Sequence, residues 1–222
     1  MWLTLIRSNP SFKTERTRFF FKYFNRANKP VEEVAAIFRQ IDLMVNRINE
    51  KTGKNIDSEE MYLMVISMMN DGNDTLQDID VFALYDEMEQ MVFKYQPEVY
   101  SPDTVRVLRH LKQTEGATLS ILSNTGFIKG RTLRKILERM ELGVYFDFQL
   151  YSDETGLSKP EEKLFRLMLD RVADTRKASV DPKRVIHIGD NPVADILGAG
   201  AVGIDSLLVN SNQLSILSLL TK

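Results

Sequence analysis

Residues 185–203 read VIHIGDNPVADILGAGAVG, and this stretch decides the fold. It begins with an apolar run typical of a buried strand, turns at Gly189, and continues with small and apolar residues typical of a helix. Asp190 directly follows the strand, and Asp195 comes five residues later. Two carboxylates at a strand end suit a hard cation such as Mg²⁺, which takes one or two carboxylates and keeps several waters. The alternative is an acidic turn followed by an acid early in a helix, where the helix dipole favours it.

The same alternation of short apolar runs and helix patterns fills the second half of the chain. Further apolar runs are ATLSILSNT at 117–125, FDFQLY at 146–151 and IDSLLVN at 204–210, each next to an amphipathic segment. Strands that alternate with helices predict a parallel sheet covered on both faces. Right-handed crossovers then make a doubly wound, Rossmann-like α/β domain, in which ligands bind beyond the carboxyl ends of the strands.

Residues 11–96 have a different pattern and read almost wholly as helix. One predicted helix has Pro30 at its start and Gly53 at its end, and another begins at Asp57 with Glu60 in a capping-box position. A helical segment ahead of an α/β pattern is most simply a lid on that domain. We therefore predict an all-helical cap domain at 11–96, inserted into an α/β core made of 1–10 and 97–222.

Two other strand ends carry polar residues that suit an anion. Ser123, Asn124 and Thr125 follow one apolar run, and hydroxyl, amide and backbone N–H groups at a strand–helix junction form an anion cradle. Lys159 precedes Pro160 at the start of a helix, where its charge would neutralise a phosphate or an attacking carboxylate. The alternatives are a turn with a helix cap for the first group and a solvated helix-start lysine for the second.

A cradle, a lysine and an acid pair on successive strand ends are the parts of a phosphoryl-transfer site. The arrangement resembles the haloacid dehalogenase (HAD) superfamily. The stretch SDETGLSKPEEKLF at 152–165 also resembles the sequence that surrounds these motifs in the superfamily. The resemblance implies that Lys159 is catalytic and that the helical segment is the superfamily's cap. It also implies Mg²⁺ as cofactor and a small phosphorylated substrate. The implied phosphate-binding residues are Ser123, Asn124, Thr125 and Lys159, and the implied metal ligands are Asp190, Asp195 and the backbone carbonyl of Trp2.

The opening stretch MWLTLIRSNP looks like the end of the superfamily's first motif, D-x-D-x-T, in which the first Asp attacks the substrate. Thr4 matches its Thr and Trp2 stands where the second Asp would be, so the nucleophile is expected one residue before Met1. The first motif lies on a central strand buried on both sides. We therefore expect either a start that is truncated, with a central slot left in the sheet, or a shift of MWLTLI into that slot. The alternative is that this stretch is an ordinary apolar end of an N-terminal strand. The shift would bring Arg7 near the nucleophile position; we favour the truncated start as a hypothesis.

Trp2 and the acid pair point to different activities. Trp cannot transfer a proton, and the superfamily's dehalogenases carry an aromatic residue there, but they work without metal and lack G-D-x-x-x-x-D. The acid pair therefore favours a Mg²⁺-dependent phosphatase, with the chain as given expected to be inactive without its nucleophile. Two alternatives stay open: a non-catalytic protein that binds a phosphorylated ligand, and a haloacid dehalogenase-type carbon-centred hydrolase.

Composition excludes several other classes of function. The 222-residue chain has a formal net charge of −2, which argues against a nucleic-acid partner bound through phosphates. It has no cysteine, and no apolar run approaches the length of a membrane span. We predict a cytoplasmic protein with no membrane partner, and a homodimer is left open. His187 alternates with Ile186 and Ile188 and is expected to be a core histidine with a satisfied ring.

Overall fold

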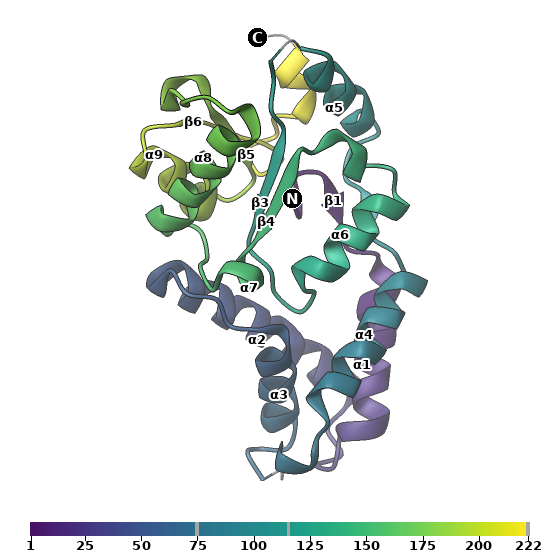
Figure 1. The fold of residues 1–222 in the computed structure, drawn as a ribbon. Helices are drawn as coiled ribbons and strands as arrows, with labels where there is room; N and C mark the ends of the chain where they lie inside the picture. Colours follow the sequence, from purple (N-terminus) through teal and green to yellow (C-terminus); the bar gives the residue numbers. More distant parts are fainter. Residues whose placement is uncertain (74–75, 115, 221–222) are drawn as a thin grey trace.

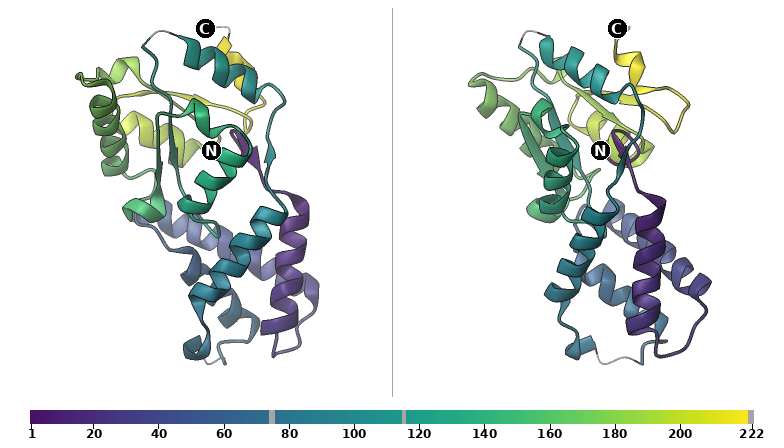
Figure 2. Two further views of the ribbon diagram at one scale, coloured as in Figure 1. Left: turned by 45° about the vertical axis from the view of Figure 1, so that its right-hand side comes forward. Right: turned by 90° about the vertical axis from the view of Figure 1, so that its right-hand side faces the viewer.

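The computed structural model describes residues 1–73, 76–114 and 116–220. A bundle of helices forms the lower part of the molecule as drawn, and an α/β region forms the upper part (Figure 1). The side views in Figure 2 show that the two regions are joined where the chain leaves its N-terminal segment and where it returns from the bundle. The helical bundle lies beneath the lower ends of β3 and β4.

Within the described residues, the helical bundle contains four α-helices, including the two whose starts the sequence predicts. They are α1 (Pro10–Phe24), α2 (Val31–Thr52), α3 (Ser58–Met69) and α4 (Val81–Lys94), with a short 3₁₀ turn, η1 (Leu76–Asp78), before the last. The start of α3 carries the predicted capping box, in which Asp57 and Glu60 each accept a backbone N–H of the other's segment. Gly53 ends α2 with a left-handed backbone, a conformation that glycine adopts without strain.

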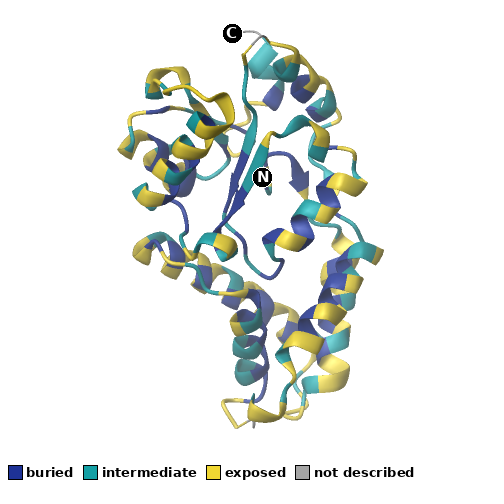
Figure 3. Ribbon diagram, viewed as in Figure 1, coloured by how far each residue is buried: buried dark blue, intermediate teal, exposed yellow. Residues whose placement is uncertain are grey.

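The bundle encloses one aromatic-rich hydrophobic cluster. Phe20 is fully buried and its ring packs against those of Phe38 and Tyr62, with centroids 4.9 and 5.6 Å apart. Phe127, from the loop after β3, joins the same cluster at 5.4 Å from Phe38. The inner faces of these helices are buried and their outer faces exposed, as the amphipathic spacing predicts (Figure 3).

The α/β region is built from parallel strand pairs flanked by helices. β3 (Ser120–Ser123) pairs in parallel with β4 (Phe148–Tyr151), and β5 (Ile186–Gly189) pairs in parallel with β6 (Asp205–Leu208). The α-helices of this region are α5 (Thr104–Gln113), α6 (Gly130–Arg139), α7 (Ser152–Thr155), α8 (Glu162–Arg176) and α9 (Gly198–Ala201). Its other helical turns are η2 (Gly143–Tyr145), η3 (Pro182–Arg184), the π-helix η4 (Pro192–Leu197) and η5 (Ile216–Leu220).

A short antiparallel ladder joins the two segments that connect the helical bundle to the α/β region. β1 (Ile6–Arg7) pairs with β2 (Glu98–Val99), and Asn9 Nδ2 donates a 3.2 Å hydrogen bond to the Gln96 carbonyl. The alternative in which Arg7 lies near the nucleophile position is therefore wrong, and residues 1–5 form no strand paired with β3 or β5 in the described sheets. Arg7 is exposed and pairs with Glu98, because the ladder holds it where the chain passes between the α/β region and the bundle.

A cleft of about 460 Å³ separates β3 from β5. Residues 120–122 of β3 line one side and residues 186–188 of β5 line the other. The described strands accordingly form three two-stranded sheets. Ile186 keeps 43% of its surface exposed, which is unusual for an apolar residue of a parallel sheet. Met1, Thr4 and Leu5 of the N-terminal segment also line the cleft.

The architecture is thus a doubly wound α/β fold with an inserted helical cap, as predicted. In the structure, the helical segment runs from Pro10 to Lys94. The division into a cap at 11–96 and a core of 1–10 and 97–222 stays a prediction.

Candidate active site

A buried ion pair lies at the carboxyl end of β5. Lys159 Nζ is 2.5 Å from Asp195 Oδ1, and both side chains are more than nine-tenths buried. His187 Nε2 lies 2.9 Å from the same carboxylate oxygen, and the backbone N–H of Asn191 donates to the other at 3.0 Å. Burial alone would raise the pKa of Asp195, but Lys159 and His187 outweigh it and hold that pKa well below its ordinary range. Asp195 is therefore an ionised acceptor that fixes the lysine.

The local chain geometry explains how Asp195 reaches this place. Asp195 lies in the π-helix that follows β5, and Asn191 caps that helix by accepting the N–H groups of Val193 and Ala194. A Cβ at Gly189 would stand 2.1 Å from the Asp195 carboxylate. Glycine is required there because any side chain would occupy the space that the carboxylate takes.

Asn124 holds Lys159 through the backbone. Its Oδ1 accepts the Lys159 N–H at 2.7 Å, and its Nδ2 donates to the Lys159 carbonyl at 3.0 Å. This pair of bonds joins the loop after β3 to the segment before α8, which are 35 residues apart in the sequence. Asn124 thus positions the lysine, and its predicted contact with phosphate stays a prediction.

Thr125 is held by hydrogen bonds to Ser152, which directly follows β4. Its N–H donates to Ser152 Oγ at 2.8 Å, and the two hydroxyls are 2.9 Å apart. Ser152 in turn donates to Asn55 Oδ1 of the cap at 2.7 Å. The loop 123–126 is therefore held from two sides. Ser123 Oγ, by contrast, makes only a local 3.0 Å bond to the Asn124 carbonyl, so a rotation of its χ1 would free it for a ligand.

Asp190 lies beside the N-terminal segment. Thr4 Oγ1 is 3.2 Å from Asp190 Oδ1 and 3.3 Å from the Trp2 carbonyl oxygen. Burial, with a contribution from Asp195, raises the pKa of Asp190 above its ordinary value. The Met1 amino group is buried close to Lys159, Asp195 and Asp190, and burial lowers its pKa to about 5. The N-terminal segment, Lys159, Asp190 and Asp195 thus lie close to one another at the same site.

These groups can be tested for their fit to Mg²⁺. Among the residues that the structure describes, no cluster of three His, Cys, Asp or Glu side chains forms a ready-made metal cage. Mg²⁺ does not require one, because it keeps several waters and takes one or two carboxylates. Asp190 and the nearby Trp2 carbonyl are hard oxygen ligands of that kind, so the residues fit the ion. Asp195 is already bonded through both oxygens, and its role as a ligand stays a prediction.

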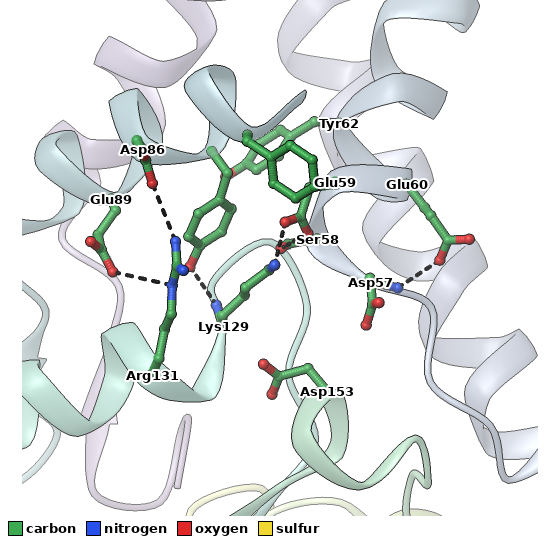
Figure 4. A network of polar contacts seen from close by, with 12 residues as sticks. Asp57, Ser58, Glu59, Glu60, Tyr62, Asp86, Glu89, Lys129, Arg131 and Asp153 are labelled. Carbon is green, nitrogen blue, oxygen red and sulfur yellow. Dashed lines mark hydrogen bonds and ion pairs between the residues drawn. The ribbon is translucent and has the colours of Figure 1, made fainter. Parts of the chain in front are cut away.

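A polar network joins the cap to the start of α6 (Figure 4). Lys129, in the loop after β3, forms an ion pair with Glu59 of α3, and its N–H donates to Tyr85 Oη of α4 at 2.9 Å. Arg131 pairs with Asp86 of α4 at 3.2 Å. These contacts join two cap helices to the start of α6.

The structure brings together most of the side chains that the sequence predicts. Lys159 and Asp195 are in direct contact, Asn124 is bonded to Lys159, and Thr4 joins Trp2 to Asp190. His187 is satisfied, as expected, but its partner is Asp195. Sequence reasoning missed Ser152 and the cap residues Asn55 and Glu50, the last of which accepts from Asn191 Nδ2 at 2.8 Å. No motif marks them.

The fold and this site define a capped, doubly wound α/β hydrolase. A family model described as a haloacid dehalogenase-like hydrolase matches residues 4–203. The chain therefore belongs to the haloacid dehalogenase-like hydrolase family. Among solved structures, a HAD hydrolase of Bacillus subtilis bound to magnesium superposes with a TM-score of 0.69 at 18% identity, covering 95% of this chain and 86% of the other. A HAD phosphatase of Thermococcus onnurineus gives 0.65 at 20% identity, with coverage of 95% and 83%.

Curated relatives match over shorter lengths. The mouse haloacid dehalogenase-like hydrolase domain-containing protein 3 is 34% identical over 51% of this chain and 43% of its own length. The ribulose-1,5-bisphosphate 5-phosphatase of Halopiger xanaduensis is 32% identical over 75% of this chain and 64% of its own. The matched region thus spans less than half of the mouse relative. Within the described residues, no helix has both the length and the apolar character to cross a bilayer.

Proposed function

We propose that the site belongs to a Mg²⁺-dependent phosphatase of a small phosphorylated metabolite. The observation that supports this most is the meeting of Lys159 with Asp195 beside Asp190, at the end of the sheet where a doubly wound fold binds ligands. Relatives named as phosphatases of ribulose 1,5-bisphosphate and of glyceraldehyde 3-phosphate are in keeping with a small phosphate ester.

The residues have separate tasks in this proposal. Lys159 and Ser123 hold the phosphoryl oxygens, with backbone N–H groups of the loop after β3 completing the cradle. Asp195 and Asn124 position Lys159, the first through its ammonium and the second through its backbone. Asp190 and the Trp2 carbonyl would hold Mg²⁺, which would supply positive charge that offsets the charge of the phosphoryl group.

An Asp inserted before Met1 would add a carboxylate to this site. The Met1 amino nitrogen is buried near Lys159, Asp190 and Asp195, so a residue attached to it enters the site directly. Its side chain would attack phosphorus while the bond to the ester oxygen breaks, and the leaving oxygen would take a proton from water. A water molecule would then cleave the aspartyl phosphate, which releases inorganic phosphate and restores the carboxylate. The cap, held by the Glu59–Lys129 pair, would keep bulk water from the reaction.

Binding without hydrolysis is the second candidate. It is favoured by one observation: the first aspartate in the sequence, Asp42, belongs to α2 of the cap, so the chain as given carries no aspartate in the N-terminal segment beside Lys159. In this case the same pocket would retain a phosphorylated ligand and leave its ester bond intact.

The test compares two forms of the protein, the chain as printed and a version with one Asp inserted before Met1. Both are assayed for phosphate release from a panel of small phosphate esters with Mg²⁺ or with EDTA, and for halide release from 2-haloacids. We expect Mg²⁺-dependent phosphate release from the Asp form, and a reduction of about 100- to 1,000-fold in its Lys159→Ala variant. The exposed Lys163, on α8, provides the matched control Lys163→Ala, which should retain the rate.

Two results would go against a phosphatase. Halide release that needs no metal would favour the dehalogenase. Ligand-induced thermal stabilisation by phosphate esters in both forms, without turnover, would favour the binding protein.

A further inference from the structure

The cap carries a buried amide that has no partner within the described chain. Asn49 of α2 is 1% exposed, and neither its Nδ2 nor its Oδ1 makes a hydrogen bond. Buried polar side chains are nearly always bonded, because taking a donor or acceptor out of water without a replacement destabilises the folded state. The missing partner is therefore expected to be something other than the protein.

Neighbours of Asn49 in α2 contact two loops of the candidate active site. The next residue, Glu50, accepts from Asn191 in the loop that carries Asp190. One turn later, the Gly53 carbonyl accepts the N–H of Ser158 at 2.9 Å, directly before Lys159. The last two turns of α2 thus bridge the loops that hold the two charged residues of the site, and Asn49 lies within this bridge.

The sequence of α2 fixes the direction of the Asn49 side chain. The buried face of the helix runs through Phe38, Ile41 and Val45 to Asn49, at the three- and four-residue spacing of one helix face. The first three belong to the hydrophobic cluster of the cap. Asn49 continues the same inward face at the end that contacts the core, where a polar residue replaces the apolar series.

A second buried polar group without a partner lies on the α/β side of the contact between α2 and the segment before Lys159. Ser158 is fully buried, and its Oγ has no hydrogen-bond partner. Its backbone N–H is the donor to Gly53 described above, so the residue belongs to the contact between α2 and the Lys159 segment. Two buried polar side chains, one from each region, are thus left unsatisfied where the cap meets the phosphate-binding lysine.

The chemistry of these groups indicates the ligand. An amide offers two donors and an acceptor, and a serine hydroxyl both donates and accepts. Neither group carries charge, so the two side chains supply no ion pair to a second phosphate or to a carboxylate. A carbon-bound hydroxyl, which donates and accepts in turn, satisfies both. Resting on the proposed function, we propose that Asn49, aided by Ser158, selects phosphate esters of polyhydroxylated compounds by hydrogen bonding to a hydroxyl near the phosphate.

The test measures binding, so it does not depend on turnover. Calorimetric titrations in Mg²⁺ compare glycerol 3-phosphate, propyl phosphate, which lacks the two hydroxyls, and inorganic phosphate. We expect glycerol 3-phosphate to bind about tenfold more tightly than propyl phosphate, the preference given by one or two hydrogen bonds to otherwise unpaired buried groups. The variants Asn49→Ala and Asn49→Leu should reduce this preference to within about twofold while leaving the Kd of inorganic phosphate unchanged.

The controls separate selection from folding. Asn46 is an exposed asparagine of the same helix, and Asn46→Ala should keep the full preference. Asn49→Leu removes the unpaired amide but fills its volume, so it should remain folded, as checked by circular dichroism. An unchanged preference in folded Asn49→Leu would overturn the proposal, since water would then be the partner of the amide. If inorganic phosphate fails to bind, or binds equally to Lys159→Ala, the proposed function fails and this inference fails with it.

Discussion

The helical bundle and the α/β region achieve their packing in different ways. The bundle has one continuous cluster, with Phe20 fully buried among aromatic rings. The α/β region has two clusters, one around Ile121 and α6 and the other around Phe165 and α8, and the cleft beside β3 and β5 has residues of both in its walls. Helices bury a stripe whose spacing is local in sequence, whereas a sheet needs every strand of its order in place. The comparison teaches that the cap is packed around a single cluster, to which the core contributes Phe127, whereas the packing of the core is divided in two beside its cleft.

The largest effect should come from the cap cluster. Phe20→Ala removes a fully buried ring that contacts Phe38 and Tyr62, and should lower the free energy of unfolding by about 3–5 kcal/mol. The neighbouring Phe21 is 42% exposed, and Phe21→Ala should change stability by less than about 1 kcal/mol. Urea unfolding of both variants measures the difference. Equal losses would show that the cap is not packed around a distinct inner face.

The two strands beside the cleft allow a sharper test within the core. Ile121 of β3 is 3% exposed and Ile186 of β5 is 43% exposed. Ile121→Ala should cost about 2–5 kcal/mol, and Ile186→Ala about 1 kcal/mol or less, because the second side chain already contacts solvent. The measurement is again urea unfolding. A loss at Ile186 as large as that at Ile121 would mean that the cleft is closed in solution and that the contrast between cap and core is smaller than described.

The smallest effect concerns the contact between the two regions. Burial alone would raise the pKa of Glu59, but the hydrogen bond from Lys129 and further polar contacts bring it below the ordinary value of 4.5. A carboxyl whose folded-state pKa is depressed stabilises the fold above its unfolded pKa and loses that contribution as pH falls through the folded value. Unfolding free energies measured from pH 7 to pH 3 should therefore fall more steeply in the wild type than in Glu59→Gln.

The expected contribution of this pair is about 1 kcal/mol or less, since both side chains keep some exposure. Glu60→Gln is the neighbouring control. Glu60 bonds the Asp57 N–H within the cap, so it reports on the helix start and not on the cap–core contact. Parallel pH profiles for wild type and Glu59→Gln would show that the pair does not hold the cap.

Much of the fold and part of the site could be predicted from the sequence. Lys159 and Asp195 follow different strands, and strand ends of a parallel sheet meet at one edge, so their contact follows from the topology. The capping box at Asp57 and the end of α2 at Gly53 are local signals of the same clarity.

Other features depend on contacts that no local pattern encodes. The role of Asn124 in holding Lys159 requires the positions of two loops, and the Asn55–Ser152 bond requires the orientation of the cap on the core. The placement of Arg7 was wrong for a similar reason. The apolar residues before Arg7 carry no local signal that fixes where Arg7 itself lies. The antiparallel pairing of Ile6 with Val99 decides it.

The ladder between β1 and β2 also has a consequence for how the molecule is assembled. Because Arg7 and Glu98 stand side by side, the chain leaves the α/β region and re-enters it at a single point. Insertions are tolerated where the two ends of the inserted piece lie close together. The helical bundle is therefore an exchangeable insertion. A short turn between β1 and β2 could replace it without changing the order of the strands. A helical bundle of another shape, inserted at the same junction, would place different side chains opposite Lys159, Asp190 and Asp195.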